Sequence, residues 1–377
     1  MLLLPPAVLA LFVLAASPAR AGEPGTAGAG FLKFAVGPRA VGMGESGAAA
    51  AEDAYAAYWN PAGLALVPFP QLAATYNRSF AGVDHQYLSL AWPLRAGSTL
   101  NLNFTRLGVA ALDGFDAQGT RTGGVEAGAQ ALGVGYGRTL AGDGADRPQL
   151  HAGLGLKGVR ESLAGASAQT VAADLGLLAV WRAFGANNSR DSEWRLGFSA
   201  LNLGPGLKFD AERAPLPTAY RLGLAWRVRP RGDVLTLSAD PVLSRDEGIF
   251  AALGAEYAVW RVLALRLGYR TGQDIGMGFR GGVGFKLKAV EIDYAIAPFG
   301  ELGQMHRMGL TVRLGGRVET TPPEERALKA VLERGARLMK EGRYYEALLE
   351  YDRALGLDPG NRSALEGMRR ANEKLEK

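Results

Sequence analysis

Apolar and polar side chains alternate along the middle of this chain in segments of about ten residues, and turn-forming residues separate the segments. In STLNLNFTRL, for example, Leu100, Leu102 and Phe104 share one face of an extended chain, while Asn101 and Asn103 share the other. Side chains of a β-strand point alternately to opposite faces, so this pattern predicts strands with one apolar and one polar face. A tilted strand of about ten residues is also long enough to cross a bilayer.

Fourteen segments fit this description. We expect strands at residues 70–79, 85–94, 98–107, 128–140, 148–160, 168–182, 193–203, 218–228, 233–240, 248–257, 260–270, 277–288, 290–298 and 305–315. Long connections often follow the odd-numbered strands, and several tight turns follow the even-numbered ones. An even number of strands with long loops at one rim and short turns at the other is typical of outer-membrane barrels.

A soluble β-sandwich is the alternative, because its strands also alternate. In lipid, every backbone polar group must be bonded within the protein, and a closed barrel achieves this. We therefore favour a mainly β fold with a 14-stranded antiparallel transmembrane β-barrel over residues 69–316. Its lipid boundary would carry aromatic residues such as Trp92, Trp226 and Tyr269. The charged residues expected to line the interior are Arg221, Arg227, Arg266, Arg270, Arg280, Lys286, Glu291 and Asp293.

The first 21 residues form an apolar stretch that ends in Ala19-x-Ala21. An apolar stretch before a pair of small residues is typical of a signal peptide, and we expect residues 1–21 to be removed. The usual Lys or Arg near the start is absent, and a retained N-terminal anchor is the alternative.

The stretch VGMGESG contains Gly42-x-Gly44-x-x-Gly47, a spacing also found in dinucleotide-binding loops. A dinucleotide site also needs an acidic residue about 20 positions later. No Asp or Glu lies between Asp53 and Asp84, and the intervening AYWNPAGLALVPFP is too rich in Pro and Gly for the next strand. These glycines therefore favour a structural role in sharp turns and close packing.

The same region resembles a known family. The matching residues are Phe31-Leu32-Lys33, Arg39-Ala40-x-Gly42-Met43-Gly44, Glu52-Asp53 and Trp59-Asn60-Pro61-Ala62-Gly63. Together they are similar to the N-terminal segment of the PorV/PorQ family, which is related to the FadL long-chain fatty acid transporters. The resemblance implies that residues 22–68 form a plug, or hatch, inside the barrel. Its motif residues would be Gly42, Gly44, Gly47, Asn60, Pro61 and Gly63.

Residues 317–377 are charged and have the periodicity of helices. The stretch GRYYEALLEYDRALGLDPGN resembles the second half of a tetratricopeptide repeat (TPR), and a generic amphipathic hairpin is the alternative. Small residues in such a repeat let two helices approach while tyrosines fill the groove between them. The residues that match the repeat, and that we expect in its packing or partner face, are Gly342, Tyr344, Ala347, Tyr351, Ala354 and Pro359.

The sequence offers little for catalysis or cofactor binding. The chain has no Cys, and its histidines, His85, His151 and His306, belong to no motif with a nucleophile or with metal-ligand spacing. The net charge of +5 comes from interspersed acids and bases, without the basic runs typical of nucleic-acid binding. We expect no enzyme activity, no metal, no cofactor and no nucleic-acid partner.

Two functions remain open. The helical tail favours a PorV-like scaffold or shuttle in protein export or envelope assembly, whose partner would be a periplasmic or secretion-system protein. The alternative is a FadL-like channel for uptake or export of hydrophobic small molecules, with a ligand held in the barrel. Both place the chain in the lipid of the bacterial outer membrane. An even number of crossings would then leave the C-terminal tail in the periplasm.

Overall fold

A computed structural model describes most of the chain. The described residues are 25–79, 82–94, 97–110, 112–125, 127–142, 148–183, 192–210, 212–273, 275–316 and 323–375. The expected signal peptide, residues 1–21, lies outside them. The chain divides into a large unit that ends near residue 318 and a helical unit that begins at residue 319.

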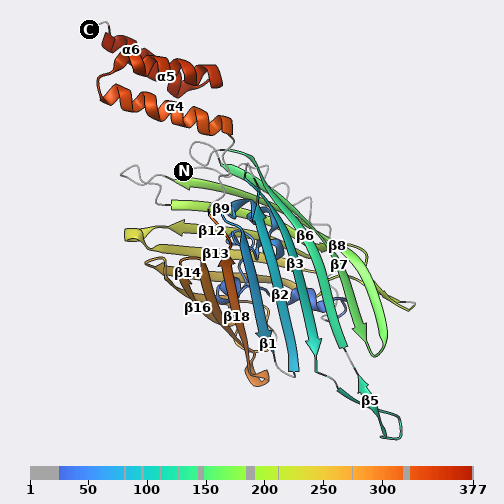
Figure 1. Cartoon of the computed structure of the whole chain (residues 1–377). Helices are drawn as coiled ribbons and strands as arrows, with labels where there is room; N and C mark the ends of the chain where they lie inside the picture. Colours follow the sequence, from blue (N-terminus) through green and yellow to red (C-terminus); the bar gives the residue numbers. More distant parts are fainter. Residues whose placement is uncertain are drawn as a thin grey trace. The chain divides into compact units, whose positions relative to one another are not determined.

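The large unit is a closed antiparallel barrel of fourteen strands, which confirms the predicted fold class (Figure 1). The first strand, β1, pairs with the last, β18, from Gln71 opposite Arg313 to Arg78 opposite His306. The barrel strands are β1 (Gln71–Arg78), β2 (Val83–Pro93), β3 (Ser98–Val109), β6 (Ala127–Ala141), β7 (Gln149–Leu163), β8 (Ala166–Ala183), β9 (Ser192–Leu203), β12 (Ala219–Val228), β13 (Val234–Ser244), β14 (Gly248–Val259), β15 (Leu263–Arg270), β16 (Phe279–Leu287), β17 (Val290–Pro298) and β18 (Gln304–Arg313).

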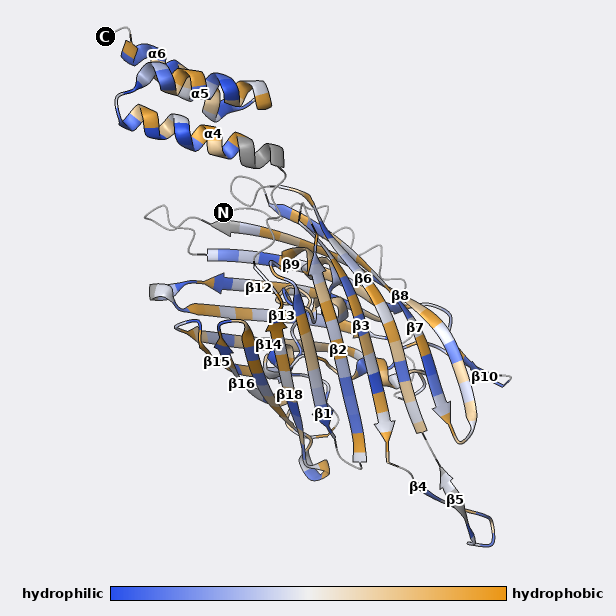
Figure 2. Cartoon of the chain, viewed as in Figure 1, coloured by the Kyte–Doolittle hydropathy of each residue, from blue (hydrophilic) through white to orange (hydrophobic). Residues whose placement is uncertain are grey.

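The two faces of the wall differ as the alternation predicts. Leu102, Val134 and Leu156 are about half exposed on the outside, whereas Asn101 and Arg195 point inward and are buried. Orange apolar positions alternate with blue polar positions along the strands in Figure 2. An apolar outer face around a polar interior is the surface of a barrel that sits in lipid.

The two ends of the barrel carry different connections. At one end, here the turn rim, β1 begins, β18 ends and short turns such as 260–262 and 288–289 lie. At the other end, the long-loop rim, longer connections include two small hairpins that the sequence did not predict. These hairpins are β4–β5 (Leu112–Phe115 and Arg121–Val125) and β10–β11 (Leu207–Phe209 and Glu212–Ala214). Their strands have three to five residues, too few for alternation to be recognised.

Residues 25–70, here the plug, lie inside the ring of strands. Their elements are η1 (Gly30–Lys33), α2 (Pro38–Gly42), α3 (Ala56–Trp59) and η2 (Pro61–Leu66), drawn in blue in Figure 1. Trp59 and Leu64 have no exposed surface. No helix among the described residues is long and apolar enough to cross a membrane.

The plug touches the wall at glycines. A Cβ atom added to any of seven inward-facing strand glycines would lie between 1.9 and 2.8 Å from a backbone atom of the plug. This glycine belt consists of Gly137, Gly153, Gly176, Gly197, Gly223, Gly254 and Gly268. Its members stand directly opposite one another on neighbouring strands in three groups: 137, 153 and 176; 197 and 223; 254 and 268. Backbone-to-backbone contact of this kind is open only to glycine.

The described part of the helical unit, residues 323–375, has three helices, α4 (Pro323–Lys340), α5 (Tyr344–Leu357) and α6 (Arg362–Leu375). The ring of Tyr351 lies between Gly335 of α4 and Gly367 of α6, where an added Cβ would lie 2.9 and 2.4 Å from ring atoms. Ala347 and Ala354, which like Tyr351 belong to α5, are fully buried. Gly342 has a φ of +77° in the turn between α4 and α5. Tyr344 begins α5, and Pro359 follows it.

The glycine belt generates a test of how tightly the wall holds the plug. In Gly153→Val, the new Cβ would lie 2.2 Å from the carbonyl carbon of Pro61, so the plug or the strand must shift. Overpacking of this kind costs about 1–3 kcal/mol, so we expect thermal unfolding, followed by circular dichroism, at a clearly lower temperature. Gly158→Val on the same strand is the control, because nothing lies within 4 Å of its added Cβ. Equal unfolding temperatures for the two variants would contradict the contact.

Candidate functional site: the plug and its two chambers

The plug runs through the barrel from one rim to the other. Near the long-loop rim, the Gly28 amide donates to the Pro215 carbonyl (2.8 Å) and the Ala29 amide to the Glu161 carboxylate (2.9 Å). Lys33 donates to Asp246 in the β13–β14 connection at 2.6 Å. At the opposite end, Phe69 and Pro70 lead into β1 at the turn rim. The plug therefore separates the lumen into two chambers.

Ion pairs hold the plug to the wall. Glu52 accepts from Arg195 (2.6 Å) and from Arg227 (2.5 and 3.0 Å). In the opposite sense, Arg39 of the plug binds Glu256 of the wall through two hydrogen bonds of 2.8 Å. Planar bidentate pairs of this kind fix orientation as well as distance.

A second plug acid, Glu45, forms ion pairs with wall arginines toward the long-loop rim. Its carboxylate lies 3.0 Å from Arg280 and 3.6 Å from Arg270. Its backbone carbonyl accepts a bond from Arg221, whose guanidinium lies 5.0 Å from the centre of the Trp59 ring. Removal of one member of a buried pair typically costs about 3–5 kcal/mol, because the other charge is then unpaired in a poor solvent.

The charged residues predicted to line the interior border the two chambers. Arg266 bonds Glu256 and Asp293 of the wall rather than a plug acid. Lys286 pairs with Glu291 at 2.8 Å. Sequence reasoning missed the interior charges Arg39, Glu45, Glu193, Arg195, Glu256 and Arg307. Those on strands occupy inward positions of the same alternation, so a complete reading of parity in segments such as EWRLGFSA would have found them.

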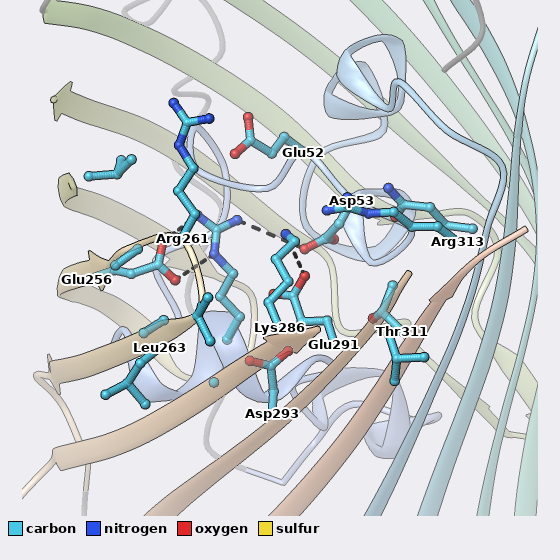
Figure 3. A pocket seen from close by; sticks show the side chains of 18 of the residues that line it. Glu52, Asp53, Glu256, Arg261, Leu263, Lys286, Glu291, Asp293, Thr311 and Arg313 are labelled. Atoms are coloured by element: carbon cyan, nitrogen blue, oxygen red, sulfur yellow. Dashed lines mark hydrogen bonds and ion pairs between the residues drawn. The ribbon is translucent and has the colours of Figure 1, made fainter. Parts of the chain in front are cut away.

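The chamber at the turn rim is the larger one, with a volume of about 730 Å³. Figure 3 shows Lys286 and Glu291 facing each other on its wall, with Glu52 and Asp53 of the plug opposite. The charged residues that line it are Arg39, Arg227, Arg229, Arg261, Arg266, Lys286, Lys288, Arg313, Glu52, Asp53, Glu256, Glu291 and Asp293. Cations therefore outnumber carboxylates, but most of the buried cations are paired with a carboxylate.

The chamber at the long-loop rim has a volume of about 230 Å³ and a mixed lining. Its apolar part includes Phe34, Tyr58, Phe250, Phe299 and Met305. Six cations line it, against two carboxylates: Lys33, Lys157, Arg221, Arg270, Arg280 and Arg307, against Glu45 and Glu247.

Arg307 on β18 is the unusual member of this chamber. Its side chain is buried, yet its Nε and Nη1 atoms have no hydrogen-bond acceptor, and no described carboxylate lies within ion-pair distance. The nearby plug acid Glu45 is already shared by Arg280 and Arg270. A buried cation without a partner is costly, so this position favours an anion that the chain itself does not supply.

The glycines of the VGMGESG stretch make structural contacts. Gly44 has a φ of +71°, and an added Cβ would lie 2.3 Å from the Leu253 carbonyl oxygen. Added Cβ atoms at Gly42, Gly47 and Gly63 would meet Gly282, Trp59 and the Ala51 carbonyl oxygen, respectively. These close approaches, and a following helix that does not begin until Ala56, leave no phosphate cradle at the motif.

Asn60 and Pro61 join the plug to the glycine belt. The Asn60 amide nitrogen donates to the carbonyls of Ala48 (2.7 Å) and Leu177 (3.1 Å), and its amide oxygen accepts from the Ala62 backbone (3.0 Å). Pro61 then occupies the first position of η2, where its fixed φ favours the helical turn.

The three histidines make local contacts. The His85 ring bonds Thr105 at 2.9 Å, His151 bonds Thr139 at 3.0 Å, and His306 bonds Tyr294 at 2.6 Å. Among the described residues, no group of three or more His, Asp or Glu side chains has the arrangement of a metal site.

Glu45 and Asp53, two of the plug acids with shifted pKa values, lie outside the membrane-spanning strands. Burial alone would raise the pKa of Glu45, but the charges of Arg280 and Arg270 lower it to about 2. Burial raises the pKa of Asp53 to about 6, and Arg39, 4.0 Å away, offsets this only in part. Glu52 pairs with the wall arginines Arg195 and Arg227, whereas Asp53 lies nearest to Arg39 of the plug.

Comparison with known proteins gives likenesses of structure only. No family model matches this chain, and no curated protein matches it. The chain is similar to the CymD monoaromatic hydrocarbon channel, with 12% identity over 74% of this chain and 96% of that one, and a TM-score of 0.46. It is also similar to the P. putida toluene transporter TodX, with 11% identity over 75% of this chain and 99% of that one, and a TM-score of 0.45. A Pseudomonas aeruginosa FadL homologue has 12% identity over 74% of this chain and 98% of its own, with a TM-score of 0.41.

The shifted pKa of Asp53 predicts a titration inside the barrel. As the pH falls from 8 to 5, Asp53 should take up a proton with a midpoint near pH 6, because the folded protein favours its neutral form. Infrared spectroscopy should then show a growing carboxylic-acid carbonyl band that is smaller by one group in Asp53→Asn. Glu45→Gln should leave the band unchanged in this range, since the pKa of Glu45 is about 2. Identical titrations of Asp53→Asn and the parent would show that Asp53 is not the group.

Proposed function

We propose that this chain is a non-enzymatic barrel of the bacterial outer membrane that binds a small amphipathic anion in the long-loop chamber and passes it across the membrane. The observation that carries the proposal is the unpaired, buried guanidinium of Arg307 in that chamber. A ligand with one carboxylate would supply the missing acceptor, and charge-assisted hydrogen bonds of this kind are among the strongest in proteins.

The rest of the lining fits the apolar part of such a ligand. Phe34, Phe250 and Phe299 border the same space as Arg307. The Arg270 guanidinium lies 4.1 Å from the centre of the Phe250 ring, so the aromatic and cationic parts of the lining are in direct contact. Small-molecule sites typically combine an apolar lining with a few convergent polar groups. A volume of about 230 Å³ suits one compact molecule.

Passage to the turn-rim chamber requires the plug to move. The belt contacts and the pairs of Glu52 and Arg39 close the space between the chambers. We infer that binding and transfer are separate steps, with a rearrangement of the plug between them. The direction of transfer, uptake or export, follows from the gradient of the ligand rather than from the lining of the chamber.

Removal of the Arg307 charge tests the proposal. In Arg307→Met we expect benzoate and octanoate to bind at least about tenfold more weakly, because a charged hydrogen bond contributes about 1.5–3 kcal/mol. Benzyl alcohol and octanol should bind the parent and the variant equally, since they lack the carboxylate. Binding is measured by isothermal titration calorimetry on the purified full-length protein in detergent.

Arg313→Met on the same strand is the matched control, because Arg313 lines the other chamber and lies over Phe69. It should bind both carboxylates as the parent does. Arg307→Met should also fold at least as well as the parent, since it removes an unpaired buried charge. Equal carboxylate affinities for Arg307→Met and the parent would contradict the proposed function.

The helical unit supports a second candidate function, a scaffold for protein export or envelope assembly. Its buried core around Tyr351 is complete, yet Tyr345, Leu349, Leu357 and Leu365 are about half exposed or more. Apolar residues of this kind on a TPR-like surface are candidates for contact with a periplasmic or secretion-system protein. This role is compatible with the barrel's ligand chamber.

Deletion of residues 317–377 separates the two candidates. If the tail recruits an export partner, the deletion should reduce the amount of secreted and surface-attached protein, measured by quantitative proteomics of intact cells and medium. Benzoate binding by the purified barrel should be unchanged, because the chamber contains no tail residue. An unaltered set of exported proteins would remove the scaffold from consideration and leave the channel.

A further inference from the structure

The outer wall carries a row of polar side chains where lipid-facing positions are otherwise apolar. Gln86, Arg106, Gln130, Arg160 and Gln169 are all exposed, and each stands directly opposite the next on neighbouring strands from β2 to β8. Directly opposite residues of an antiparallel sheet share a face and lie about 5 Å apart. The five side chains therefore form one continuous polar row on the outside of the barrel.

The row borders the apolar belt directly. Two residues closer to the turn rim on the same strands, a second row contains Leu88, Phe104, Leu132 and Val171, all more than a third exposed. The step from one row to the next is about 7 Å along the strand. Charged side chains are tolerated on a lipid-facing wall only near the interface, so the row marks the level of the lipid headgroups on the long-loop side.

A groove of about 800 Å³ opens at this boundary. The first half of β8 extends beyond the end of β9, and the segment that follows β9 takes the vacant place: Thr170 donates to the Pro205 carbonyl at 2.7 Å. The small hairpin β10–β11 therefore lies beside β8 (Figure 2). Phe104, Leu132 and Val171 line the groove on the barrel side, and Pro205 and Gly206 border it on the other.

Three cations point into this groove. Arg160 comes from the polar row, and Lys208 and Arg213 stand opposite each other on β10–β11. Leu207, the neighbour of Lys208, is fully buried against the interior, so the cationic face of the hairpin is its outer one. No carboxylate lines the groove, and none of the three cations forms an ion pair with a described residue. Gln130 and Gln169 add amide donors beside them.

We propose that this groove binds a phosphorylated lipid of the leaflet on the long-loop side, of the lipid A class. Three cations and two amides match phosphate oxygens, which are multiply charged acceptors. Acyl chains of the same molecule lie on Phe104, Leu132 and Val171, which face hydrocarbon. A soluble protein or peptide does not fit, because the apolar half of the groove lies at the depth of the bilayer. The proposal needs a membrane-inserted barrel but not the ligand proposed for the interior chamber.

The test uses purified full-length protein in detergent, titrated with diphosphoryl lipid A and followed by native mass spectrometry. We expect one tightly held lipid per protein, with monophosphoryl lipid A bound more weakly and phosphatidylethanolamine weaker still. The triple variant Arg160→Gln, Lys208→Gln, Arg213→Gln should bind diphosphoryl lipid A at least about tenfold more weakly, since each cation near a lipid surface adds several-fold in affinity. All three positions are exposed, so folding should be retained.

A second triple variant, Arg138→Gln, Arg261→Gln, Lys288→Gln, is the matched control. It loses the same charge from exposed positions that lie outside the groove, and it should bind lipid A as the parent does. Equal weakening in the two triple variants, or none in the first, would overturn the proposal. It would also be overturned if millimolar inorganic phosphate displaced the lipid, because the groove would then be a site for free phosphate.

The same measurements distinguish this proposal from the interior site. Arg307→Met, which lies inside the barrel, should retain lipid A, and the groove variant should retain benzoate. Loss of lipid A in Arg307→Met would place the lipid in the chamber and overturn the external site. If the groove variant lost benzoate binding but Arg307→Met retained lipid A, only the assignment of benzoate to the interior chamber would be contradicted.

Discussion

The structure depends on the contact between the backbone of the plug and the backbone of the wall. Seven strand glycines let backbone atoms of the plug approach to distances at which any side chain would clash. Three of them, Gly137, Gly153 and Gly176, form a continuous strip against the segment from Asn60 to Ala65. Glycine in a strand normally weakens the strand, because the unfolded chain gains conformational entropy and there is no side chain to pack. Here the plug supplies the missing packing, so wall and plug stabilise each other.

Because the belt brings the plug so close, the charges must meet in a fixed arrangement. Glu52 reaches Arg195 and Arg227, and Arg39 reaches Glu256, only when the chain between them follows the belt. Buried pairs add little net stability, because desolvation offsets most of their attraction. They do penalise a shifted plug, which would leave several charges unpaired. The glycines therefore bring the plug close to the wall, and the ion pairs select one position for it.

Much of the barrel could be predicted from the sequence, because a period of two assigns each residue to a face. All fourteen barrel strands were predicted in this way, but β4–β5 and β10–β11 were not, since strands of three to five residues show no period. Parity also gives the inward direction of Arg266 and Arg280. It does not give their partners, because the path of the plug decides that Arg280 meets Glu45 while Arg266 bonds only wall acids. The unpaired state of Arg307 depends on the same path.

The face of the wall on which a residue lies does not determine its environment, as the arginines of the wall show. Arg280 and Arg307 both point inward, yet only Arg280 has a carboxylate partner. Arg160 shares its outward face with Leu156, yet lies beyond the apolar belt, where a charge meets headgroups rather than hydrocarbon. Exposed cations at the turn rim, such as Lys288, are solvated by water and need no partner. Arg307, by contrast, is buried without a carboxylate partner, and Arg160 lies at the edge of the apolar belt; both lie toward the long-loop rim. The two sites that we propose therefore lie at that end of the barrel, inside and outside the same wall.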